Sequence, residues 1–156
     1  MSSSHQIEHI EVEEPPVHYV LVDTEDDAYL MGEGGYPTDL EHSRLDMMHC
    51  MFKLTMSGQL FLAPVEVEQP LRVLDIGTGA GIWAVEVGDQ YPNIKMVLGS
   101  DLSPIQPDLV PPPNVVFEVD DVEAEWPPRR PFDLIHARYM CGSIQDWPKL
   151  FHQAYQ

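Results

Sequence analysis

The sequence predicts an α/β fold with a doubly wound parallel sheet, on the strength of three observations. The run Arg72–Ile76 has the apolar pattern of a buried strand and leads directly into a glycine loop and a helix. Further short apolar runs follow, separated from one another by a helix or by a long crossover. Acidic residues stand where these runs end, and ligands bind at the carboxyl ends of the strands in such sheets.

Four strands and two helices are expected in this part of the chain. One helix extends from Ala80 to about Gln90, and a last helix starts near Ser143 or Asp146 and continues to the C-terminus. The strand runs, in chain order, are Arg72–Ile76, Ile94–Gly99, Val115–Val119 and Phe132–His136.

The crossover between the second and third strands is not expected to be a helix. It contains Pro104, Pro107 and Pro111–Pro113. Proline lacks the backbone N–H and clashes with the preceding helical turn. An extended arm is therefore expected in place of the usual crossover helix.

Three segments are expected along the chain: an acidic, mostly disordered leader at residues 1–28, a helical segment at 29–66, and the α/β core at 67–156. Eleven acidic residues and no Lys or Arg fall within residues 1–43. Two interpretations of this charge stay open. It is a solvated, flexible tail, or it docks on a basic partner.

The segment before the core predicts a helix that begins after Thr38. Thr38 and Glu41 have the spacing of a capping box. Leu45, Met48, Phe52 and Met56 recur at helical spacing and are expected to form one apolar face, and the methionines Met47, Met48, Met51 and Met56 are interpreted as helix core. His42, Asp46 and His49 share this helix and are interpreted as neutral helix residues, so no metal is expected.

Composition limits the classes of partner. The net charge of −18 repels phosphate backbones, so binding to nucleic acid is not expected.

No apolar run approaches the roughly 20 residues that cross a bilayer, and residues 1–9 lack the pattern of a signal peptide. Cys50 and Cys141 are far apart, which favours free thiols in a cytoplasmic or nuclear protein.

The glycine loop, Asp75-Ile76-Gly77-Thr78-Gly79-Ala80-Gly81, is the main functional signal. A phosphate-binding P-loop would end in Gly-Lys-Ser/Thr, which is absent. A dinucleotide loop needs its third glycine where Ile82 stands. The pattern D-x-G-x-G-x-G instead resembles the first motif of class I S-adenosylmethionine (SAM) methyltransferases. SAM carries a sulfonium and an ammonium and no phosphate, so an acidic loop suits it.

Further acids agree with a nucleoside ligand. Asp101 ends the second strand, where a carboxylate accepts hydrogen bonds from both ribose hydroxyls. Asp121 follows the third strand and is placed to accept from the adenine amino group, while Val122 offers a backbone N–H to the ring. All elements occur in the expected order along the chain.

The flanking residues narrow the resemblance, from about Tyr29 to the end, to the LaeA-like fungal methyltransferases, which are linked to secondary metabolism and in some members to velvet-type regulatory proteins. The matching motifs are Tyr36-Pro37-Thr38-Asp39, Glu41, Arg44-Leu45-Asp46, His49, Gly81-Ile82-Trp83-Ala84, Leu102-Ser103-Pro104-Ile105-Gln106-Pro107, Asp120-Asp121, Trp126, His136-Ala137-Arg138-Tyr139-Met140 and Asp146-Trp147.

The resemblance implies a set of SAM-binding residues: Asp75, Gly77, Thr78, Gly79, Asp101, Leu102, Asp121 and Val122. Arg138 and Tyr139 follow the fourth strand, where this Rossmann-like fold faces its substrate. Packing for Tyr139 and a surface ion pair for Arg138 remain alternatives. No catalytic base is predicted, because alignment of an activated methyl group supplies most of the rate.

Complete members of the family order their strands 3-2-1-4-5-7-6, and this chain is expected to supply only 3-2-1-4. The fourth strand would then be an open edge that pairs with a second copy or with another protein, a velvet-type partner included. Three explanations stay open: a shortened chain of little activity, a natural truncation completed by a partner, or a fold redirected to a non-methylating reaction such as cyclisation, or to binding alone. The leading expectation is methyl transfer to a natural product or a protein.

Overall fold

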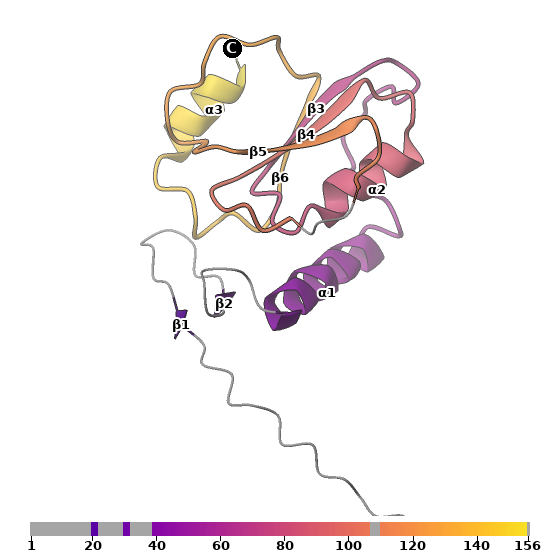
Figure 1. The fold of residues 1–156 in the computed structure, drawn as a ribbon. Helices are drawn as coiled ribbons and strands as arrows, with labels where there is room; N and C mark the ends of the chain where they lie inside the picture. The colour runs from indigo at the N-terminus through magenta and orange to yellow at the C-terminus, as the bar shows by residue number, and fades with distance from the viewer. Residues whose placement is uncertain (1–19, 22–29, 32–38, 107–109, 156) are drawn as a thin grey trace, which may run out of the picture.

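The computed structural model describes residues 20–21, 30–31, 39–106 and 110–155 (Figure 1). Most of the predicted leader, Thr38 of the capping box and Pro107 of the crossover lie outside the described residues. The elements that precede the core are a two-stranded antiparallel pair, β1 (Val20–Leu21) and β2 (Leu30–Met31), and the helix α1 (Asp39–Thr55).

Four parallel strands form the central sheet, in the order β5-β4-β3-β6. In chain order they are β3 (Arg72–Ile76), β4 (Met96–Asp101), β5 (Val115–Val119) and β6 (Leu134–Ala137). Numbered from the glycine-loop strand, this order is 3-2-1-4. The predicted doubly wound, incomplete Rossmann-like sheet is therefore confirmed.

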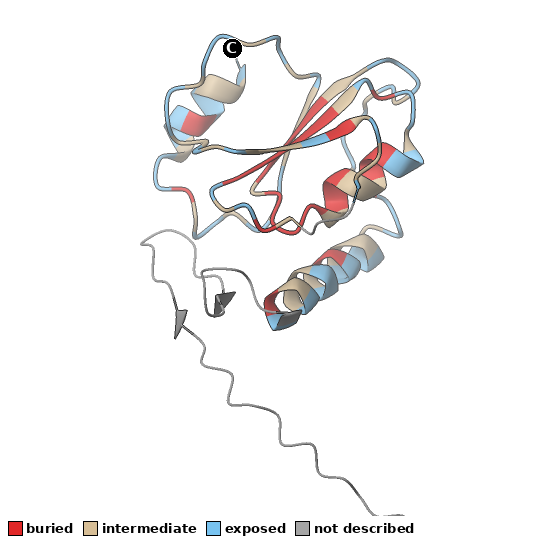
Figure 2. Ribbon diagram, viewed as in Figure 1, coloured by how far each residue is buried: buried red, intermediate tan, exposed pale blue. Residues whose placement is uncertain are grey.

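Helices cover both faces of the sheet (Figure 1). The helix α2 (Ile82–Gln90) packs on one face, and α3 (Trp147–Tyr155) packs on the other, while α1 contacts α2. Alternate residues of β3 serve the two faces, because side chains alternate along a strand. Val73 belongs to the core under α2, whereas Leu74 and Ile76 belong to the core under α3. Figure 2 shows the buried residues gathered along these strands and the inner side of α2.

The predicted bounds of two strands and one helix need correction. The second strand was expected at Ile94–Gly99, but β4 starts at Met96 and continues to Asp101. Ile94 is 1 % exposed and lies in a turn, where its N–H bonds to the Tyr91 carbonyl. The hydrophobic character of Ile94 therefore indicates that the residue is buried, and not that it belongs to a strand. The fourth strand occupies 134–137 where 132–136 was expected.

The helix after the glycine loop begins at Ile82 and not at Ala80. Gly81 has φ +79°, a left-handed conformation that cannot belong to a right-handed helix, so the loop ends two residues later than the sequence suggests. The final helix begins at Trp147, close to the predicted start at Asp146. The described residues of the proline crossover contain no helix, as predicted.

α1 forms where it was predicted, and the predicted apolar residues Leu45, Met48, Phe52 and Met56 are half-buried. The two most buried side chains described on it are polar, Glu41 and His49. Met47 and Met51 are 60 % and 50 % exposed, so the prediction that these methionines form helix core is wrong. The reason is that α1 rests against the core along one side only, which Leu45, Met48 and Phe52 share with charged residues.

Two further features bear on the predicted partners. β6 pairs with β3 on one side, and no other described strand pairs with its second side. Within the described residues, none of the helices has both the length and the apolar character that crossing a membrane requires.

Candidate cofactor site

The glycine loop connects β3 to α2 and approaches the ends of the neighbouring strands. The Thr78 N–H bonds to the Ser100 carbonyl at 3.0 Å, and the Gly79 N–H donates to Asp101 Oδ2 at 2.8 Å. Gly77 has φ +65°, and a Cβ placed there would collide with the thioether sulfur of Met140. The loop is thus held by the strand that carries Asp101, and the positive φ at Gly77 favours glycine there.

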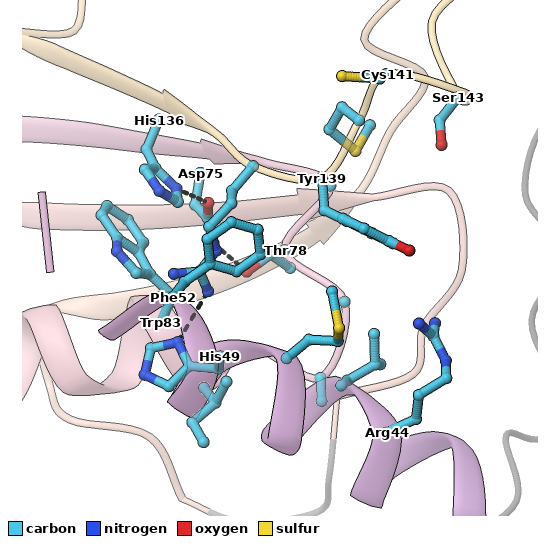
Figure 3. Close-up of a pocket in the computed structure, with 18 of the residues that line it drawn as sticks. Arg44, His49, Phe52, Asp75, Thr78, Trp83, His136, Tyr139, Cys141 and Ser143 are labelled. Atoms are coloured by element: carbon cyan, nitrogen blue, oxygen red, sulfur yellow. Dashed lines mark hydrogen bonds and ion pairs between the residues drawn. The ribbon is translucent and has the colours of Figure 1, made fainter. Parts of the chain in front are cut away.

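Two cavities open beside this loop. The first, which we call the α1 cavity, has a volume of about 630 Å³ and lies between α1, the loop and the residues after β6 (Figure 3). The second, which we call the strand-end cavity, has a volume of about 440 Å³ and lies over the ends of β4 and β5. Both are lined by Gly77, Met140 and Ser143, so they adjoin each other at the loop.

Every residue predicted to contact the cofactor or substrate lines one of these cavities. The α1 cavity contains Asp75, Gly77, Thr78, Gly79, Arg138 and Tyr139. The strand-end cavity contains Gly77, Asp101, Leu102, Asp121 and Val122. Residues from four separate parts of the sequence therefore meet around the glycine loop, as the topology of a parallel sheet requires.

The strand-end cavity presents oxygen acceptors and one backbone donor. Asp101 is only 3 % exposed, and its two oxygens accept from the N–H groups of Gly79 and Ser103. Asp121 accepts from the Glu123 N–H at 2.9 Å and is exposed. The Val122 N–H has no partner within the described residues.

Asp75 lies at the floor of the α1 cavity and is 3 % exposed. Its Oδ2 accepts from the Thr78 hydroxyl at 2.7 Å, and its Oδ1 lies 2.6 Å from Nδ1 of His136. Asp75 and His136 are register partners in β3 and β6, which directs both side chains to the same face. The Trp83 indole stacks on the His136 ring at 3.7 Å between centroids (Figure 3).

Arg138 connects the α1 cavity to α1. Its Nη2 lies 2.8 Å from Nδ1 of His49, and its guanidinium stacks over the Phe52 ring at 4.9 Å. Its Nη1 is buried and has no hydrogen-bond partner in the described chain. Burial lowers the pKa of the Arg138 guanidinium, an effect that the nearby Asp75 and Glu86 carboxylates oppose.

His49 is 2 % exposed, and burial lowers the pKa of its imidazole. Its Nε2 lies 3.3 Å from Glu86 Oε2, and Glu86 is in turn paired with Lys53 at 2.6 Å. The sequence assigned no role at the site to His49, His136 or Trp83. The pairing of the Val73–Ile76 and Leu134–Ala137 runs is the one signal that predicts where His136 lies.

No group of three or more metal-ligating side chains gathers within the described ranges. Thr78, Gly79 and Asp101 instead form a compact set of hydrogen-bonding groups around a ligand-sized space.

Known proteins resemble this chain over most of its length. Methyltransferase pytC of Aspergillus terreus is 49 % identical over 128 residues, which is 81 % of this chain and 39 % of that protein. Secondary metabolism regulator LAE1 of Cochliobolus heterostrophus is 45 % identical over 125 residues, or 77 % of this chain and 40 % of that one. Protein-methionine methyltransferase laeA of Emericella nidulans is 39 % identical over 117 residues, or 74 % and 30 %.

The chain thus spans about two fifths of the length of its first curated relatives. A solved structure from Listeria monocytogenes, described as an S-adenosylmethionine-dependent methyltransferase, aligns with a TM-score of 0.50 at 20 % identity over 58 % of this chain and 44 % of that one. At this identity the likeness shows the fold. Residues 47–156 match the family described as methyltransferase domain, and the chain belongs to that family, among the LaeA-like fungal methyltransferases.

Proposed function

We propose that this chain binds S-adenosylmethionine across the two adjoining cavities and forms the cofactor-binding part of a methyltransferase of fungal secondary metabolism. The observation that carries the proposal is that the α1 cavity and the strand-end cavity meet at Gly77 and include every predicted cofactor residue. The adenosine part lies in the strand-end cavity, and the rest of the cofactor continues past the glycine loop.

The charges of the strand-end cavity suit a nucleoside that carries no phosphate. Its acidic lining residues are Asp101, Asp120, Asp121, Glu123 and Asp146, and Lys149 is its one basic residue. Such a lining repels a phosphate and attracts the cationic sulfonium. Asp101 takes the ribose hydroxyls, and Asp121 with the Val122 N–H takes the adenine edge.

S-adenosylmethionine, when bound, supplies a methyl group already activated on its sulfonium. The chain binds the cofactor and orients it, which is the main requirement of such a transfer. Met140 packs on Gly77 where the two cavities meet, so its flexible thioether must shift when one ligand spans both. The acceptor, a natural product or a protein, approaches beside Tyr139, which is 65 % exposed and lies edge-on to Phe52.

Calorimetric titration with S-adenosylhomocysteine, the stable product form of the cofactor, tests this function. Asp101→Ala is expected to abolish measurable binding. Asp89→Ala removes an exposed carboxylate of α2 away from both cavities and is expected to bind as the wild type does. Because Asp101 also bonds to the loop, a thermal melt must establish that the variant is folded. Equal affinity of folded Asp101→Ala and wild type would refute the ribose assignment.

Transfer of a labelled methyl group from S-adenosylmethionine to extracts of fungal metabolites and proteins tests the reaction itself. Labelled product supports the methyltransferase. Binding without any transfer would favour a role in cofactor binding or in a different reaction.

We further propose that a second copy of the chain, or another protein, pairs with the open side of β6. Unpaired strand edges carry a row of N–H and C=O groups that bind a further strand. Light scattering after size exclusion tests this proposal, and a stable soluble monomer would contradict it. The exposed free thiols of Cys50 and Cys141 favour a cytoplasmic or nuclear location.

A further inference from the structure

We propose that Glu123 is a positioning residue for adenine recognition, because it ties the turn that carries Asp121 to the start of α3. The inference rests on the proposed function and deepens it by naming what holds the adenine-binding groups in place. Glu123 is half-buried and lines the strand-end cavity, yet its N–H, its carbonyl and its carboxylate all bond to the protein. It therefore acts on the ligand through Asp121 and Val122.

The turn after β5 is held at both ends of one peptide group. The Glu123 N–H donates to Asp121 Oδ1 at 2.9 Å, which orients this exposed carboxylate. At the other end of the same planar group, the Val122 carbonyl accepts from Trp126 Nε1 at 2.8 Å and from Gln153 Nε2 at 3.3 Å. Gln153 belongs to α3, so one of these bonds already comes from that helix.

The side chain and carbonyl of Glu123 make the main connection to α3. Its Oε1 accepts from the N–H groups of Gln145 at 3.0 Å and Asp146 at 2.7 Å, and its carbonyl accepts from Nζ of Lys149. Asp146 in turn caps the helix, because its Oδ1 accepts from the Lys149 N–H at 2.9 Å. Glu123 thus bonds both to the capping residue and to the first turn of α3.

α3 has its own attachment to the sheet. Leu150 is 3 % exposed and belongs to the core cluster that includes Leu74 and Ile76 of β3. Val122 and Trp126 pack against the same cluster. The sheet therefore sets the position of α3, and the hydrogen bonds of Glu123 fix the turn at the adenine edge relative to α3.

The direction of the Asp121 carboxylate decides which base fits. The 6-amino group of adenine donates to a carboxylate, whereas the 6-oxo group of hypoxanthine is an acceptor and is repelled. The ring N1 accepts in adenine but carries a proton in hypoxanthine, where it opposes the Val122 N–H. A site built to bond an N–H rejects an analogue that lacks it, and a hydrogen bond weakens steeply at a poor angle. A turn that loses its attachment to α3 therefore loses its preference for adenine.

Calorimetry with S-adenosylhomocysteine and its inosine analogue measures this preference. The wild type is expected to bind the inosine analogue about 10-fold or more weakly. Glu123→Ala is expected to lose most of the preference, because it weakens S-adenosylhomocysteine and leaves the affinity for the inosine analogue nearly unchanged. Glu123→Gln keeps a side-chain oxygen for the two N–H groups and should retain the preference. Glu125→Ala removes an exposed carboxylate of the same loop that lines neither cavity, and this matched control should behave as the wild type does.

Gln153→Ala tests the same attachment from α3. Gln153 lines neither cavity, so a change in ligand preference at this position must act through the turn. The variant is expected to reduce the preference several-fold. Hydrogen exchange adds a second measurement, because coupling between the ligand and α3 is reciprocal. Saturating S-adenosylhomocysteine should protect the amides of α3 in the wild type and protect them less in Glu123→Ala.

Thermal melts establish which variants are folded, and Gln153→Ala decides if Glu123→Ala does not fold. An equal loss for both ligands in these variants would mean a general structural role and would overturn the inference, as would a preference that neither variant changes. If the wild type binds both ligands equally well, Asp121 does not distinguish the bases, and the inference fails while the proposed function stands. If the wild type binds neither ligand, the proposed function fails as well.

Discussion

Arg138 Nη2 and His49 Nδ1 lie 2.8 Å apart, although 89 residues separate them in the chain. The guanidinium is always a donor, so Nδ1 must present its lone pair, and the remaining proton of a neutral ring sits on Nε2, which faces Glu86. This contact fastens α1 to the residue that follows β6. The wall of the α1 cavity therefore depends on a neutral histidine.

The first prediction concerns pH. Burial lowers the pKa of His49 in the folded protein from 6.5, so protonation favours the unfolded chain. Above pH 6.5 the imidazole is neutral in both states and does not affect stability. Below it, the unfolded chain binds the proton more readily, so the free energy of unfolding should fall as the pH drops from 6.5 towards the lowered pKa. Urea denaturation at about pH 7.5 and about pH 5.5 measures this change.

Glu86 contributes in a lower window. The Lys53 ammonium lowers the pKa of the Glu86 carboxyl below 4.5 against the opposing effect of burial, so its contribution is lost only in more acidic solution. His49→Gln should reduce the difference in the free energy of unfolding between about pH 7.5 and about pH 5.5. If His49→Gln and wild type lost equal stability over this range, His49 would not be the titrating group.

The second prediction separates backbone strain from crowding in the glycine loop. Gly77 and Gly58 both have positive φ, +65° and +85°, so alanine at either site is strained by roughly 1–2 kcal/mol. A Cβ at Gly77 meets Met140, whereas a Cβ at Gly58 meets nothing within 4 Å. Gly77→Ala should therefore weaken the binding of S-adenosylhomocysteine about 10-fold or more. Gly58→Ala should lower only the melting temperature. Calorimetry paired with thermal melts checks both, and an equal loss of affinity in the two variants would contradict the model of the loop.

Local signals in the sequence were sufficient to predict the parallel sheet and the glycine loop. The run Arg72–Ile76 is a strand with the predicted bounds, because an apolar run that ends in a glycine turn specifies its own limits. The apolar run that predicted the second strand stops at Gly99, and Asp101 was expected at the end of that strand. Ser100 and Asp101 belong to β4 because Ile76 and Val119 of the neighbouring strands pair with them.

The polar side of the α1 cavity could not be predicted in the same way. His49 lies on a helix whose apolar positions suggested the core face. Its partner Arg138 lies 89 residues further along the chain, and no helical period reveals this contact. His136 was visible only as the end of a strand pattern. Its partner Asp75 follows from the parallel register of β3 and β6, a long-range property.

The third prediction concerns the turn that starts α2. Gly81 has φ +79°, and a Cβ there would lie 2.5 Å from Cζ of Phe117. Gly81→Ala combines an unfavourable backbone with overpacking against β5, so we expect a loss of about 2–4 kcal/mol in the free energy of unfolding. Gly142→Ala has an ordinary φ and open space around its Cβ, and it should change stability by less than about 0.5 kcal/mol. Urea denaturation compares the two, and similar losses would show that the Phe117 contact is unimportant.

The last prediction concerns Trp83, which is 2 % exposed and joins the core to the α1 cavity. Its Nε1 donates to the carbonyl of Leu60 at 2.8 Å. Trp83→Phe keeps an aromatic ring but leaves this carbonyl without its donor in the core, so we expect a loss of about 2–4 kcal/mol from the missing hydrogen bond and the smaller volume. Trp147→Phe is the matched control, because its indole N–H has no partner among the described residues and the side chain is only half-buried. It should lose clearly less stability in urea denaturation. If Trp147→Phe lost as much stability as Trp83→Phe, the ring volume of Trp83, and not its hydrogen bond to Leu60, would determine how much it stabilises the fold.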